Sequence, residues 1–206
     1  RIIRHIQRNN AILANSNFSN GINVYLPRNC SLVTRCTFCK LKMDIVGLSA
    51  KQLIEKLKSG ELSSLDLCKA YIERIKKFEK DVHVWAHFDE KILLEKAEES
   101  DNHRKSGKPL GLLHGIPVAL KDIIGTIDMP TECGTVLRKG ISAFQDAEIV
   151  DLLKSEGAII MGKTNTTELA YFSPSKTRNP HDYSRTPGGS SSGSAAVVAS
   201  FMAPLS

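Results

Sequence analysis

With 206 residues, the sequence can form one large domain or two small ones. Its composition, 41% hydrophobic and 24% charged, is that of a globular protein and argues against intrinsic disorder. No stretch approaches the ~18 consecutive apolar residues of a membrane-spanning helix, and five cysteines are too few, and odd in number, for a disulfide scaffold. We therefore expect a cytoplasmic protein with reduced thiols and no membrane partner.

The net charge of +6 comes from the start of the chain. Residues 1–42 contain seven Lys or Arg and no Asp or Glu, whereas the remaining 164 residues contain 21 basic and 22 acidic side chains. The rest of the chain is therefore not expected to form a basic groove for nucleic acid. Met43 begins a conventional amphipathic stretch, so we predict two parts: a basic N-terminal extension over 1–42 that is not part of the fold, and an incomplete domain over 43–206.

Two other interpretations of the extension stay open. A basic segment without acidic residues is also typical of a transit peptide. Cys30, Cys36 and Cys39 have a spacing that suits zinc, but a structural zinc site has four ligands, so we predict no metal.

Capping residues and apolar spacing predict alternating helices and strands after the extension. Ser49 and Asp89 are suited to begin helices, and Gly60 and Gly157 to end them. In chain order we expect a helix over 49–59, a helix over 65–79, a strand over 82–88, a helix over 89–105, a strand over 116–120, a helix over 146–156, a strand over 158–161, a short helix over 166–171, a loop over 173–193 and a helix over 194–202. This alternation is typical of the α/β class.

Two short patterns match well-known motifs but lack the structural context that those motifs need. Residues 157–164 fit the phosphate-binding G-x-x-x-x-G-K-T loop, yet 159–161 is itself an apolar strand whose amides belong to a sheet. Residues 189–193 fit the G-x-S-x-G turn of α/β-hydrolases, but no strand precedes them and no Asp, Glu or His follows. We predict neither nucleotide binding nor an α/β-hydrolase.

Two other segments carry residues suited to catalysis. Lys121 directly follows the apolar strand over 116–120, where a lysine is usually a surface residue that extends its ammonium into water. Withdrawn from water, such a lysine releases its proton more readily and can act as a base. Residues 186–194 are rich in Gly and Ser and could be a flexible linker, but they run directly into a helix of small residues. Glycines there allow unusual backbone that directs hydroxyls and amides at one point.

These segments resemble the amidase signature family. The Gly-Gly-Ser-rich run of the family corresponds to 188–194 and its Gly-Ile-Pro-x-x-x-Lys-Asp strand to 115–122. Three further family elements follow in the expected order and spacing, at 162–165, 168–170 and 177–180. The resemblance extends over about 45–206.

The resemblance implies a Ser–cis-Ser–Lys triad. Lys121 matches the lysine that finally accepts and returns the proton, and Ser190 matches the bridging serine, whose preceding peptide bond is cis. Ser191 is expected to support this network by hydrogen bonding, and Gly188 and Gly189 to contact the substrate. The nucleophile of the family is a second serine that falls beyond Ser206. We therefore expect an amidase signature fold, a mixed sheet packed between helices and truncated at the C-terminus, and no amide hydrolysis by residues 1–206 alone.

Within the family, the short segment 171–176 between two signature elements favours a stand-alone amidase acting on a small-molecule amide, without a cofactor. An amidotransferase subunit that generates ammonia from glutamine has a longer segment there and is the first alternative. A non-catalytic fragment or pseudoenzyme is the second; its residues 1–42 would bind nucleic acid or an anionic membrane in a salt-dependent manner. For the main interpretation we expect no nucleic-acid partner, with a homodimer left open.

Overall fold

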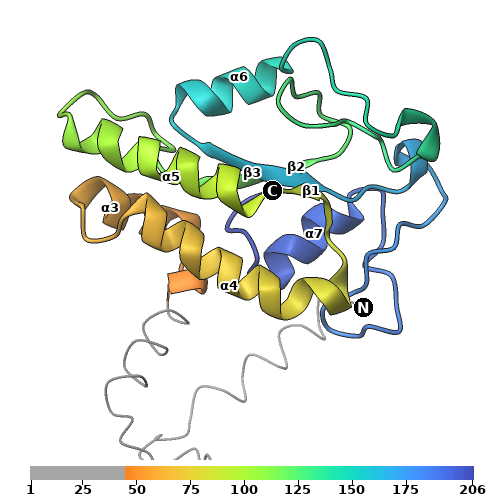
Figure 1. The fold of residues 1–206 in the computed structure, drawn as a ribbon. Helices are drawn as coiled ribbons and strands as arrows, with labels where there is room; N and C mark the ends of the chain where they lie inside the picture. The colour runs from red at the N-terminus through yellow and green to blue at the C-terminus, as the bar shows by residue number, and fades with distance from the viewer. Residues whose placement is uncertain (1–44) are drawn as a thin grey trace, which may run out of the picture. The chain divides into compact units, whose positions relative to one another are not determined.

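The computed structural model describes residues 45–206 (Figure 1). The expectations about the basic extension, its three cysteines and the boundary at Met43 lie outside these residues. The described elements are α3 (Ala50–Ser59), α4 (Ser64–Val82), β1 (Trp85–Phe88), α5 (Glu90–Lys105), β2 (Pro117–Lys121), η1 (Val136–Arg138), α6 (Glu148–Ser155), β3 (Ile159–Thr164), η2 (Glu168–Ala170) and α7 (Ser192–Ala199). None of the helices within 45–206 combines the length and apolar character needed to cross a bilayer.

The sheet is mixed, as the resemblance to the amidase signature family implies. Its strand order is β1-β3-β2, with β3 antiparallel to β1 and parallel to β2. Lys121 at the end of β2 is in register with Thr164 at the end of β3. Leu205 lies beside β2, where its carbonyl accepts a hydrogen bond of 3.0 Å from the amide of Ala119. The α/β class is therefore confirmed.

Helices pack on the sheet and on one another. Helices α5 and α6 contact β3, α7 contacts β2 and β3, and α4 lies along α5 (Figure 1). The buried carboxylate of Asp101 in α5 accepts hydrogen bonds of 2.8 and 3.0 Å from the first two amides of α4, Ser64 and Leu65. These amides have no partner within their own helix, so Asp101 joins the two helices at a point where α4 needs an acceptor.

The predicted strand over 82–88 is wrong in its first half. Helix α4 continues to Val82, and His83 ends it with a left-handed backbone at φ 55°. The carboxylate of Glu79 then accepts hydrogen bonds of 2.9 and 3.0 Å from the amides of Val84 and Trp85. The alternating apolar pattern therefore includes the end of a helix and its cap, and β1 begins only at Trp85.

Within the motif-like segment 157–164, residues 159–164 form a strand of the sheet, as expected for 159–161. Strand β3 contains six residues and ends at Thr164, beyond the predicted limit of 161. The short helix expected over 166–171 is reduced to η2, because Leu169 and Ala170 have positive φ values of 50° and 58°. Helix α7 also begins two residues before the predicted start.

Candidate active site

Lys121 and Ser190 meet at one edge of the sheet. Nζ of Lys121 donates a hydrogen bond of 2.6 Å to Oγ of Ser190, and both residues are half-buried. The peptide bond between Gly189 and Ser190 is cis. Lys121 ends β2, and the carboxyl ends of parallel strands are where α/β sheets bind their ligands. The structure thus brings together the two residues that the resemblance assigns to proton transfer.

The backbone of Ser190 is held by the segment that follows β3. Its carbonyl oxygen accepts hydrogen bonds of 3.1 Å from the amide of Thr167 and of 3.1 Å from the hydroxyl of Thr166. Strand β2, which carries Lys121, is paired with β3. Both partners of the hydrogen bond are therefore positioned by β3 or by the residues directly after it.

The start of α7 packs closely against the same segment. The amide of Gly193 donates a hydrogen bond of 2.9 Å to the carbonyl of Asn165, and Ser194 Oγ lies 2.8 Å from Thr164 Oγ1. A Cβ at position 193 would lie 2.5 Å from the backbone nitrogen of Asn165 and 2.7 Å from the carbonyl oxygen of Val84. Glycine is required here because the two backbones touch. The Gly/Ser run is thus a packed segment and not a linker.

A cavity of about 400 Å³ opens beside Ser190. Its lining includes Gly188 and Gly189, the two glycines expected to contact substrate, together with Thr167. Tyr171 and Phe172 also line the cavity, with ring centroids 4.4 Å apart, and both side chains are exposed. The cavity can accept a group of small-molecule size directly beside the Ser190 hydroxyl.

Ser191 is placed differently from its neighbour. Its side chain is exposed, and within residues 45–206 no hydrogen bond joins its hydroxyl to Lys121 or to Ser190. It occupies the N-cap position of α7 without a capping hydrogen bond from its side chain. Its expected support of the network stays a prediction.

A buried ion pair directly behind the site was not predicted from the sequence. Lys163 in β3 and Asp122, the residue after Lys121, are 0% and 2% exposed, with Lys163 Nζ 3.4 Å from Asp122 Oδ1. Burial lowers the pKa of Lys163 and raises that of Asp122, while each charge moderates the shift of the other. In the sequence, Lys163 lies in the family element over 162–165, beyond the predicted strand over 158–161, and nothing in the pattern shows that its side chain is buried.

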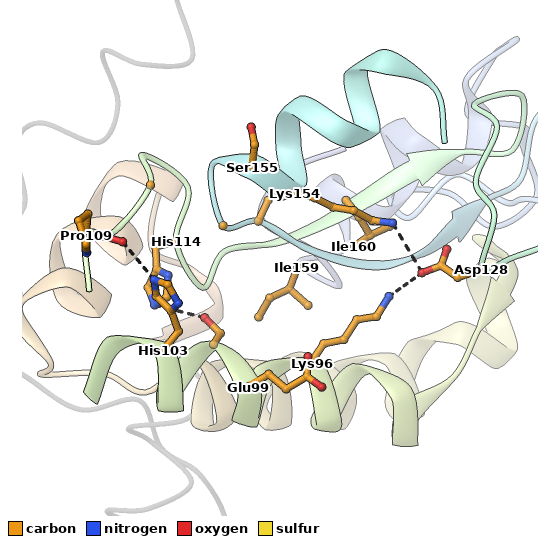
Figure 2. A pocket seen from close by; sticks show the side chains of 14 residues that line it. Lys96, Glu99, His103, Pro109, His114, Asp128, Lys154, Ser155, Ile159 and Ile160 are labelled. Carbon is orange, nitrogen blue, oxygen red and sulfur yellow. Dashed lines mark hydrogen bonds and ion pairs between the residues drawn. The ribbon is translucent and has the colours of Figure 1, made fainter. Parts of the chain in front are cut away.

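A second and larger cavity, of about 590 Å³, lies between α5 and α6 (Figure 2). Lys96 and Lys154 both reach Asp128 there, with Nζ–Oδ2 distances of 2.7 and 3.9 Å. His114 lines the same cavity next to His103, and burial lowers the pKa of His114. Neither Lys121 nor Ser190 lines this cavity, so it is separate from the candidate site.

Comparison with known families decides what kind of chain this is. The model of the family described as Amidase matches residues 66–206, a range that includes Lys121, Asp122, Lys163 and Ser190. The chain belongs to the amidase family. The resemblance found in the sequence is therefore confirmed.

Individual amidase relatives are of more than one kind. A glutamyl-tRNA(Gln) amidotransferase subunit from Thermobifida fusca is 40% identical over 168 residues, which cover 79% of this chain and 34% of the relative. The structure of a peptide amidase from Stenotrophomonas maltophilia is 35% identical with a TM-score of 0.71, over 76% of this chain and 35% of that one. A structure described as fatty acid amide hydrolase is 28% identical with a TM-score of 0.73, over 88% and 35% respectively. These neighbours confirm the amidase fold, and the chain spans about a third of the length of the relatives it matches.

Proposed function

We propose that the protein containing residues 1–206 hydrolyses the C–N bond of a small-molecule amide, with Lys121 and Ser190 as two members of a Ser–cis-Ser–Lys triad. The observation that supports this most directly is the 2.6 Å hydrogen bond between Lys121 Nζ and Ser190 Oγ. Ser190 lines a cavity of about 400 Å³, so a bound amide can reach its hydroxyl. Membership of the amidase family supports the same kind of chemistry.

The proposed reaction moves one proton along the pair and back. A serine hydroxyl beyond Ser206 attacks the amide carbon and passes its proton to Ser190, while Ser190 passes its own proton to the neutral amine of Lys121. The proton then returns by the same path to the leaving amine as the C–N bond breaks. Water hydrolyses the resulting acyl-enzyme in the second half of the cycle. Residues 1–206 alone lack the nucleophile in this mechanism and are proposed to be inactive.

Replacement of Lys121 tests the assignment. In the full-length gene product, Lys121→Ala should lower kcat/KM for amide hydrolysis by about 10²–10⁴-fold, the usual contribution of a general acid–base. Lys91→Ala is a suitable control, because Lys91 is 86% exposed on α5 and forms only a 3.8 Å ion pair with Glu95. Amide hydrolysis that survives Lys121→Ala unchanged, or Lys121-dependent turnover by residues 1–206 alone, contradicts the mechanism.

The second candidate function is ammonia production from glutamine by an amidotransferase subunit. It is favoured by the 40% identity to the glutamyl-tRNA(Gln) amidotransferase subunit from Thermobifida fusca, whereas the short 171–176 segment favours a stand-alone amidase. Measuring ammonia release by the full-length protein from glutamine and from unrelated primary amides distinguishes the two candidate functions. A stand-alone amidase acts on its amide without further subunits; turnover of glutamine that depends on tRNA and partner subunits selects the second candidate.

A further inference from the structure

We infer that the buried ion pair of Asp122 and Lys163 is a positioning device that holds Lys121 against Ser190. The inference rests on the proposed function, because it assigns these two residues to the support of a proton acceptor. Neither residue touches the candidate substrate cavity, so neither is proposed as a catalytic residue.

The pair is anchored on three separate segments. Asp122 directly follows β2, Lys163 belongs to β3, and the ammonium of Lys163 also donates hydrogen bonds of 2.8 Å to Thr131 Oγ1 and of 3.2 Å to the carbonyl of Pro130. The carboxylate of Asp122 accepts a hydrogen bond of 3.3 Å from the amide of Glu132. Each charge therefore has several fixed partners, which a buried ion pair needs if it is to hold one geometry.

Strand alternation sets Lys121 and Asp122 on opposite sides of the sheet. Successive side chains of a strand point to opposite faces, so Lys121 is on the face of Thr164, its partner in register, and Asp122 is on the face of Lys163. Thr164 bonds to Ser194 of α7, on the face where Ser190 lies. The ion pair thus fixes the end of β2 from the opposite face while leaving Nζ of Lys121 free to reach the site.

The same anchoring extends to Ser190. The amide of Cys133 donates a hydrogen bond of 3.0 Å to the carbonyl of Asp122, and the carbonyl of Cys133 accepts one of 2.8 Å from the amide of Leu169. Two residues before Leu169, the amide of Thr167 donates a hydrogen bond of 3.1 Å to the carbonyl of Ser190. Hydrogen bonds and the short backbone stretch 167–169 therefore connect the backbone of Asp122 with the backbone of Ser190. Displacement of the pair should move both partners of the Lys121–Ser190 bond.

The double variant Asp122→Asn/Lys163→Met tests this inference in the full-length protein. It removes both charges without leaving one of them unpaired in the interior, and Asn retains an acceptor for the Glu132 amide. We expect a folded protein with a cooperative thermal transition, KM within about twofold of the original, and kcat lowered by about 10²-fold, the scale of a misplacement near 1 Å. A crystal structure should show Lys121 Nζ and Ser190 Oγ separated beyond hydrogen-bonding distance.

Two comparisons separate positioning from simple structural support. Lys76→Met/Glu90→Gln removes an exposed ion pair of 2.9 Å between α4 and α5, and should leave kcat unchanged. Asp122→Glu, which keeps both charges but displaces the carboxylate by one methylene, is the substitute if the double variant does not fold. Unchanged kcat in a folded variant, or a Lys121–Ser190 contact that stays within hydrogen-bonding distance, overturns the inference. If the unaltered protein hydrolyses no amide, the proposed function fails, and the crystallographic distance still decides whether the pair positions Lys121.

Discussion

Lys121 and Ser190 are 69 positions apart in the chain, and 2.6 Å separates Nζ of the first from Oγ of the second. Neither side chain determines this geometry by itself. Lys121 is fixed by the pairing of β2 with β3, and the Ser190 carbonyl by two hydrogen bonds to Thr166 and Thr167, which follow β3 directly. A site held through backbone pairing retains its geometry when surrounding surface residues change, which suits a proton relay that needs short and constant distances.

Replacing each of the two adjacent serines should separate their roles. In the full-length protein, Ser190→Ala should lower kcat/KM by about 10²–10⁴-fold because it breaks the proton path. Ser191→Ala should lower kcat/KM less, because Ser191 is expected only to support the network and its exposed side chain has no hydrogen bond to either residue of the pair within 45–206. Steady-state kinetics on one amide substrate measures both, with the melting temperature as the control for folding. Equal losses for the two variants would contradict the separate roles assigned here.

Gly193→Ala should destabilise the fold by about 1–3 kcal/mol, the usual cost of crowding a packed interior. An added Cβ would lie 2.5 Å from the Asn165 nitrogen and 2.7 Å from the Val84 carbonyl oxygen, both backbone atoms that cannot rotate away. Urea unfolding of the 206-residue chain gives the change in free energy. Ala195→Ser, at an exposed position of the same helix, is the matched control and should stay within about 0.5 kcal/mol. If Gly193→Ala leaves the free energy of unfolding unchanged, α7 does not pack closely against the backbone of Asn165.

Much of the fold could be predicted because local signals agree with the tertiary structure. Ser49 caps α3 with both hydrogen bonds of a capping box, and Asp89 caps α5, as their positions before apolar helices indicate. The start of β1 could not be predicted, since the cap depends on Glu79, whose carboxylate reaches back over the helix end. The burial of Lys163 could not be predicted either. A buried lysine needs a partner such as the carboxylate of Asp122, which directly follows the neighbouring strand β2, and sequence spacing does not reveal this contact.

Tyr71→Phe should leave the protein as stable as before or raise its stability by about 1 kcal/mol. Tyr71 is fully buried in α4, and within residues 45–206 its hydroxyl has no hydrogen-bond partner. Removal of a buried hydroxyl that lacks a partner also removes the cost of taking it out of water. Thermal unfolding followed by circular dichroism measures the change. A loss above about 1 kcal/mol would show that the hydroxyl has a partner, such as a buried water.

The hydrogen bond from Lys154 to Asp146 should make part of the free energy of unfolding depend on pH. Lys154 Nζ lies 2.5 Å from Asp146 Oδ2, and this hydrogen bond is the main cause that lowers the pKa of Asp146 below its usual value. Because the unfolded carboxyl titrates near ~3.9, the ionised form stabilises the fold above that pH. This contribution is lost as the pH falls through the lower pKa of the folded state.

Asp146→Asn should therefore cost about 0.5–1 kcal/mol at pH 7, the scale of a partly exposed ion pair, and reduce the fall in stability below about pH 4. Lys154→Met should have the same two effects, and the double variant should add little to either single change. Urea unfolding of the three variants between pH 7 and pH 3 provides the measurement; an acid dependence that persists in Asp146→Asn would assign it to other carboxylates.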